Sequence, residues 1–150
     1  MLNSHPQKLD SAAALHRLLV ILYRSLPMYL SSAAPWTHRG DERAAKLLHH
    51  IVADQKRYTQ KIVELLFDRR QTLSFGDFPM VFTDTHDLSL DYLVNEMIFY
   101  QKQDVAAIGQ CINELRMDLP ARALAEEILG NALGHLQSLE ELQKTPAASA

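Results

Sequence analysis

The chain is poor in cysteine and in long apolar runs, and each shortage excludes a class of protein. A single cysteine, Cys111, in 150 residues cannot form an intramolecular disulfide, which favours a reducing compartment. The longest apolar run of the first helical stretch, 18–23, is broken by Arg24, and none reaches the roughly 20 residues of a membrane span. Residues 1–10 also lack the apolar core of a signal peptide. We therefore expect a cytoplasmic protein with no membrane partner.

An excess of basic charge is also missing. The formal net charge is -3, from 15 Lys and Arg against 18 Asp and Glu. The basic residues are scattered, and the pair Arg69-Arg70 is too short to bind a polyanion. A nucleic-acid-binding domain normally carries a basic stripe. We expect no nucleic-acid partner.

What the chain does have is apolar periodicity, with 47% hydrophobic residues in one domain's length. Apolar residues recur in steps of three and four, which predicts four helices over about 11–33, 41–70, 87–116 and 119–143. Their inward stripes are Leu15, Leu19, Leu22, Leu26 and Tyr29; Leu48, Ile51, Gln55, Tyr58, Ile62 and Leu65; Leu90, Val94, Met97, Gln101, Ile108, Cys111 and Leu115; and Ala125, Ile128, Ala132, His135, Leu139 and Leu142. Pro27 predicts a kink in the first helix, and Asp118 with Pro120 predicts the start of the fourth. The tail 144–150 is predicted to be disordered.

The join between the second and third helices is long and has no helical period. Some 16 residues at about 3.3 Å each can span a helix of about 40 Å, so the third helix can run parallel to the second. One long crossover distinguishes such a bundle from a simple up-down bundle. We expect Phe75, Phe78 and Phe82 to hold this crossover against the helices.

Residues spread over 11–143 resemble the ferritin-like superfamily, and bacterioferritins in particular. The matching residues are Leu15, Tyr29 and Trp36, then Leu65-Leu66-Phe67, then Gly134-His135 with Leu139-Glu140. The resemblance implies an all-α, ferritin-like four-helix bundle of antiparallel pairs with a long crossover, as a single domain over 1–150. In that family the first and third helices each supply a metal-binding Glu, and the second and fourth each supply Glu-x-x-His.

Carried over position by position, this resemblance places the metal ligands on residues that suit iron poorly. They fall on Leu22, on Gln55 and Tyr58, on or beside Gln101, and on Ala132 and His135, of which only His135 keeps the family's residue type. A shift of one residue would put Asp54 and Arg57 on the second-helix motif instead, and either way Glu-x-x-His is absent. Iron requires anionic oxygen as well as imidazole. The haem-ligating methionine of bacterioferritins falls on Lys56 or Gln55, so neither iron nor haem is expected.

Three interpretations of these positions stay open. Gln55, Tyr58, Gln101 and His135 can form a polar core layer whose members hydrogen-bond one another. The same layer can line a pocket for a small ligand. A non-standard metal site would need His135 together with Asp54 or Asp104. The adjacent His49 and His50 point about 100° apart and are expected to be ordinary surface residues, and Cys111 an inert buried thiol.

We therefore expect a non-catalytic, ferritin-like protein that has lost its di-iron site and serves in interaction or small-ligand sensing. The alternative is a metal-binding ferritin-like protein in iron storage or redox metabolism, with iron or another divalent metal. A homodimer is expected through an apolar flank of the first helix, formed by Val20, Ile21 and Met28. The resemblance points the same way, since bacterioferritin subunits pair through their first two helices.

Overall fold

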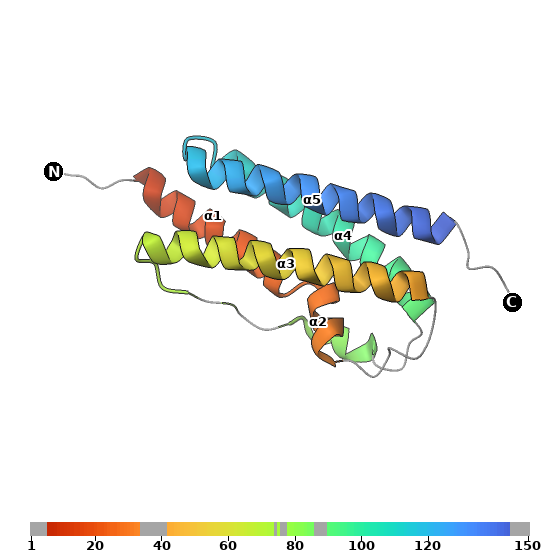
Figure 1. Ribbon diagram of the computed structural model, residues 1–150. Coiled ribbons are helices and arrows are strands. Elements are labelled where there is room, and N and C mark those ends of the chain that lie inside the picture. The colour runs from red at the N-terminus through yellow and green to blue at the C-terminus, as the bar shows by residue number, and fades with distance from the viewer. Residues whose placement is uncertain (1–5, 34–41, 74, 76–77, 86–89, 145–150) are drawn as a thin grey trace, which may run out of the picture.

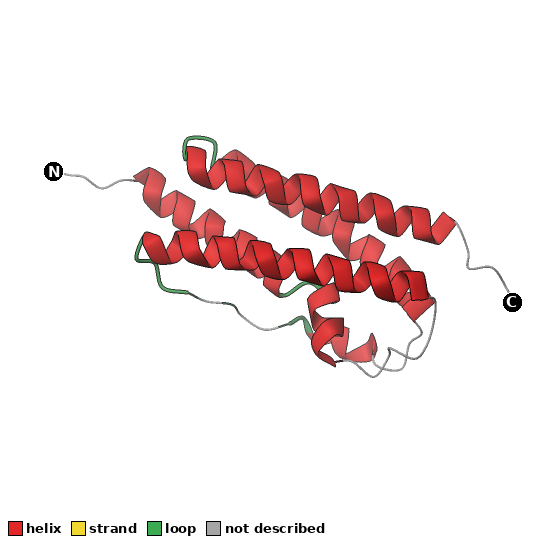
Figure 2. Cartoon of the chain, in the orientation of Figure 1, coloured by secondary structure: helices red, strands yellow, loops and turns green. Residues whose placement is uncertain are grey.

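The computed structural model describes residues 6–33, 42–73, 75, 78–85 and 90–144. These residues form an all-α structure, and no strand occurs among them (Figure 2). The helices are α1 (Pro6–Tyr23), α2 (Leu26–Ala33), α3 (Glu42–Asp68), the 3₁₀-helix η2 (Met80–Thr85), α4 (Leu90–Glu114) and α5 (Leu119–Lys144). None of the described helices is long and apolar enough to cross a membrane. Trp36, the predicted start of the second helix at 41 and the tail from 145 lie outside the described residues.

The four long helices α1, α3, α4 and α5 lie side by side, and the short helix α2 packs against α3 and α4 (Figure 1). Helix α1 contacts α3 and α4, and α5 contacts the same two helices. In Figure 1, α1 and α5 run in one direction and α3 and α4 in the other. The chain between α3 and α4 therefore returns along the length of the helices before α4 begins.

Aromatic side chains attach the described parts of this return segment to α1 and α2. The rings of Phe75 and Phe78 lie 4.6 and 6.3 Å from the ring of Tyr23, measured between centroids. Phe78 and Phe82 in turn lie 5.3 and 5.7 Å from Tyr29. These phenylalanines hold the crossover against the helices, as the sequence predicts.

The first predicted helix is in fact two helices, which corrects the expectation of one kinked helix over 11–33. Helix α1 ends at Tyr23, and α2 begins at Leu26 with Pro27 in its first turn, where a missing N–H costs nothing. Ser25 caps α2: its hydroxyl accepts the Met28 N–H at 3.3 Å, and its carbonyl accepts the Tyr29 N–H at 3.0 Å. A serine cap two residues before a proline therefore starts a new helix instead of continuing α1.

Helix α3 and helix α5 are joined at one end of the molecule by an ion pair. The Arg69 guanidinium donates to both carboxylate oxygens of Asp118, at 2.5 and 2.9 Å. Asp118 also caps α5, because its Oδ1 accepts the Ala121 N–H at 3.4 Å. Next to Arg69, Arg70 has a left-handed backbone (φ 58°) and closes the C-terminus of α3.

The predicted dimer flank is exposed only in part. Met28 is buried with Leu26 and Leu30 in the chain's own core, so its assignment to a subunit interface is wrong. The cause is the break at Ser25, which turns α2 away from the direction of α1. Val20 and Ile21 are half-buried and line an open groove between α1 and α4.

Candidate functional site

A layer of buried polar side chains divides the core into two apolar halves. One half contains Leu22, Tyr58, Ile62, Ile108 and Ala132, and the other contains Leu26, Ile51, Met97 and Leu139. Between them along each helix lie four polar residues that are only 3–4% exposed, namely Ser25, Gln55, Gln101 and His135. The 3.6-residue period places the three helical members, Gln55, Gln101 and His135, inward at one level of the structure, and the Ser25 cap joins them there. A buried polar layer of this kind fixes how the helices align along their axes.

The hydrogen bonds of this layer differ from those expected. The Ser25 hydroxyl donates to Gln55 Oε1 at 2.8 Å, and Gln101 Nε2 donates to the Ala132 carbonyl at 3.0 Å. The prediction that Gln55, Tyr58, Gln101 and His135 bond one another is wrong, because no hydrogen bond between described residues joins two of them. Each of these side chains bonds instead to a residue outside this set of four.

Tyr58 reaches outward from the layer rather than across it. Its hydroxyl donates to Glu127 Oε2 at 2.8 Å, although Glu127 itself is exposed on α5. Burial and this carboxylate both raise the pKa of Tyr58. Lys61 Nζ lies 3.7 Å from the same Glu127 oxygen. An ion pair and a hydrogen bond to Glu127 therefore join α3 to α5 at this point.

The six positions on which the resemblance places metal ligands surround one very small cavity. Its lining residues are Leu22, Gln55, Tyr58, Gln101, Asp104, Ile108, Ile128, Asn131, Ala132 and His135. The cavity volume of about 10 Å³ is about that of one water probe, so it has no room for a larger ligand. These residues do not fit a dinuclear iron centre, because Asp104 supplies the only carboxylate among them.

Asp104 is a lone acid at this cavity. Burial raises its pKa to about 7. Its carboxyl group makes no hydrogen bond or ion pair with any other described residue. One carboxyl group alone cannot supply the several anionic oxygens that a dinuclear iron centre needs.

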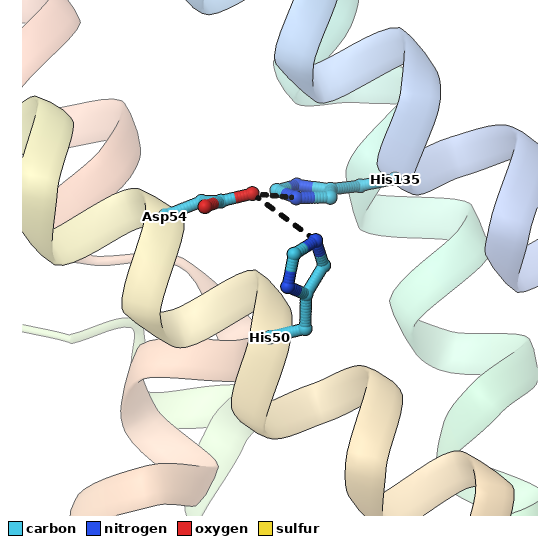
Figure 3. Close-up of side chains that lie close together, drawn as sticks. All are labelled: His50, Asp54 and His135. Carbon is cyan, nitrogen blue, oxygen red and sulfur yellow. Dashed lines mark hydrogen bonds and ion pairs between the residues drawn. The ribbon is translucent and has the colours of Figure 1, made fainter.

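A second polar cluster adjoins the layer where α3 faces α5 (Figure 3). His50 and Asp54 occupy successive turns of α3, and His135 projects toward them from α5. Asp54 Oδ2 lies 2.8 Å from His135 Nε2 and 3.5 Å from His50 Nε2. One ligand atom from each residue lies within 4.8 Å of the other two.

Two further side chains hold Asp54 in place. Asn131 Nδ2 donates to Asp54 Oδ2 at 2.9 Å, and Arg57 Nη2 donates to Oδ1 at 3.3 Å. Burial alone would raise the pKa of Asp54, but the bonds from Asn131 and His135 outweigh it and the pKa is lowered. Burial lowers the pKa of His135 despite this carboxylate. Asp54 is therefore an anion at neutral pH, and His135 a neutral donor through Nε2–H.

The structure thus brings together two of the three predicted metal-ligand candidates. Asp54 and His135 are in contact, whereas Asp104 lies on α4 and faces the small cavity. His50 is the residue of this cluster that the sequence does not predict, because an exposed histidine next to His49 is expected to be an ordinary surface residue. The available signal was its spacing of four residues from Asp54, which puts both on one face of a helix.

Cys111 is buried in the half of the core that contains Leu115. Burial raises the pKa of its thiol, and the nearby Arg17 offsets this only in part. A buried thiol with a raised pKa is a poor nucleophile, so Cys111 packs and does not react.

Comparison of the chain with protein-family models, with curated proteins and with solved structures finds no match in any of the three.

Proposed function

We propose that the chain is a ferritin-like four-helix bundle that has lost its di-iron site and acts in interaction rather than in catalysis. The observation that carries this proposal is the polar layer. Where the resemblance requires four carboxylates and two histidines, the layer holds Gln55, Gln101 and His135 with apolar residues between them. Iron placed there would lose its hydration with almost no anionic compensation.

The antiparallel pairs and the returning segment between α3 and α4 support the ferritin-like part of the proposal. That topology needs one long crossover, and the segment attached by Phe75, Phe78 and Phe82 supplies it. The six carried-over positions all line one cavity, which supports the chosen alignment of the second helix.

The size of that cavity favours interaction over ligand sensing within the layer. A space of about 10 Å³ accepts no small organic ligand, whose sites normally measure hundreds of Å³. Exposed apolar side chains instead lie where α3 ends and α5 begins: Phe67 is 74% exposed, Met117 67% and Leu119 70%. Such side chains gathered at one end of a molecule are typical of contact surfaces.

Iron content tests this proposal directly. The protein is expressed in iron-supplemented medium, purified without chelators and analysed for metals. We expect less than about one iron per ten chains, because a neutral layer does not retain the ion. Iron near two ions per chain would refute the proposal.

A further inference from the structure

The cluster of His50, Asp54 and His135 has the ligand types of a metal site distinct from the lost dinuclear one. The resemblance assigns ligands to Gln55 and Tyr58 on α3, whereas Asp54 and His50 lie on the adjoining face of that helix. Only His135 belongs to both sets. The three side chains point toward a common centre from two helices (Figure 3).

We propose that His50, Asp54 and His135 bind one zinc ion that links α3 to α5. Zinc bonds of about 2.0–2.2 Å in a tetrahedron place neighbouring ligand atoms about 3.3–3.6 Å apart. Of the two separations from Asp54 Oδ2, 3.5 Å to His50 lies in that range and 2.8 Å to His135 lies below it. All three ligand atoms within 4.8 Å need only small side-chain rotations to close on an ion.

The ligand set selects zinc over harder cations. Two imidazoles and one carboxylate suit zinc, whereas calcium and magnesium take mostly oxygen ligands. Zinc binds neutral imidazole, so His135 would present its Nε2 lone pair in the tautomer that carries its proton on Nδ1. Arg57 opposes a second positive charge, but its side chain is 56% exposed and can turn into solvent.

The cluster is also accessible from one side. The His50 side chain is 67% exposed, while those of Asp54 and His135 are 12% and 5% exposed. Zinc can therefore enter from solvent past His50 and keep a water molecule as its fourth ligand. Because two ligands come from α3 and one from α5, the bound ion stabilises the contact between these helices.

Zinc titration of the full chain tests the site, with His50→Ala as the informative variant. His50 is exposed, so its removal spares the core, and circular dichroism checks the fold of each variant. His49→Ala is the matched control: it removes another exposed imidazole that points about 100° away on the same helix. Isothermal titration calorimetry gives stoichiometry and affinity, and thermal unfolding with and without zinc gives a second readout.

We expect the wild type and His49→Ala each to bind one zinc ion per chain. His50→Ala should bind zinc at least tenfold more weakly. Zinc should raise the melting temperature of the first two proteins and not of the third. Identical titrations of wild type and His50→Ala would overturn the proposal, as would equal losses in both variants, which indicate adventitious surface binding. Either result leaves the proposed loss of the di-iron site intact, because the iron content tests that separately.

Discussion

At the scale of single residues, the two buried glutamines differ in whether their hydrogen-bond partner has another partner of its own. Gln55 Oε1 accepts the hydroxyl of Ser25, which has no other acceptor among the described residues. Gln101 donates to the Ala132 carbonyl, which lies inside α5 where the helix supplies a donor of its own. The same Gln→Leu change therefore leaves a buried donor unpaired at one position only.

We predict that Gln55→Leu lowers the free energy of unfolding by about 1–3 kcal/mol, and Gln101→Leu by less than about 1 kcal/mol. Urea unfolding followed by circular dichroism measures both. Equal losses, or a larger loss for Gln101→Leu, would mean that the hydrogen bonds of the layer are arranged differently.

The sequence predicts which polar side chains of the layer are buried, but it does not predict their hydrogen-bond partners. Gln55, Gln101 and His135 fall in the apolar stripes, and each is buried. Which atom each one reaches depends on helix rotation and on the side chains opposite. Tyr58 pairs with exposed Glu127, and His135 with Asp54 just off the stripe, so neither contact follows from periodicity.

At the scale of secondary-structure elements, the Arg69–Asp118 pair links the end of α3 to the start of α5. The hydrogen bond from Arg69 is the largest influence on the pKa of Asp118 and lowers it. Together with the hydrogen bonds from Ser11 and the Ala121 N–H, it outweighs the effect of burial, and the pKa falls to about 2. Since the folded pKa lies below the unfolded value near 4, this stabilisation is complete above pH 4. It is lost as the pH falls from about 4 through about 2.

We predict that Asp118→Ala lowers the free energy of unfolding by about 2 kcal/mol at pH 7, discounted for partial solvent screening. The difference from wild type should shrink at pH 2.5, where Asp118 is largely protonated in the unfolded chain. The control Glu126→Gln loses only an exposed pair with Arg122 and should change little. Urea unfolding of both proteins at the two pH values measures this. If the difference in free energy of unfolding is the same at both, the ionisation of Asp118 does not stabilise the fold as described.

The element boundaries show where sequence reasoning fails at this scale. The three later helices follow from their periodicity, and the Asp118 cap is where the sequence predicts it. The break between α1 and α2 was predicted only as a kink. Pro27 alone does not reveal that Ser25 would cap a new helix and bond to Gln55 across the core. That misplacement then put Met28 on the wrong surface.

At the scale of the whole molecule, the groove between α1 and α4 is the surface we propose for pairing two copies. It is lined by Val20, Ile21, Ala107 and Cys111 among others and has a volume of about 430 Å³. An apolar groove of this kind can pair with its own copy about a two-fold axis.

We predict that Val20→Glu converts a dimer to a folded monomer, because it places a charge in that apolar contact. The control is Leu133→Glu. Leu133 is exposed on α5 and lies outside the groove, so this change should leave the dimer intact. Light scattering at micromolar concentration measures the mass. Monomeric wild-type protein, or a dimer unaffected by Val20→Glu, would contradict this interface.

The rate of Fe²⁺ oxidation tests the proposed loss of di-iron chemistry most directly. Fe²⁺ is added in air to the metal-free protein, and Fe³⁺ is followed by absorbance. With Gln55, Gln101 and Ala132 where carboxylates are needed, we predict the rate of protein-free buffer. A fast phase that saturates at two irons per chain would contradict the account.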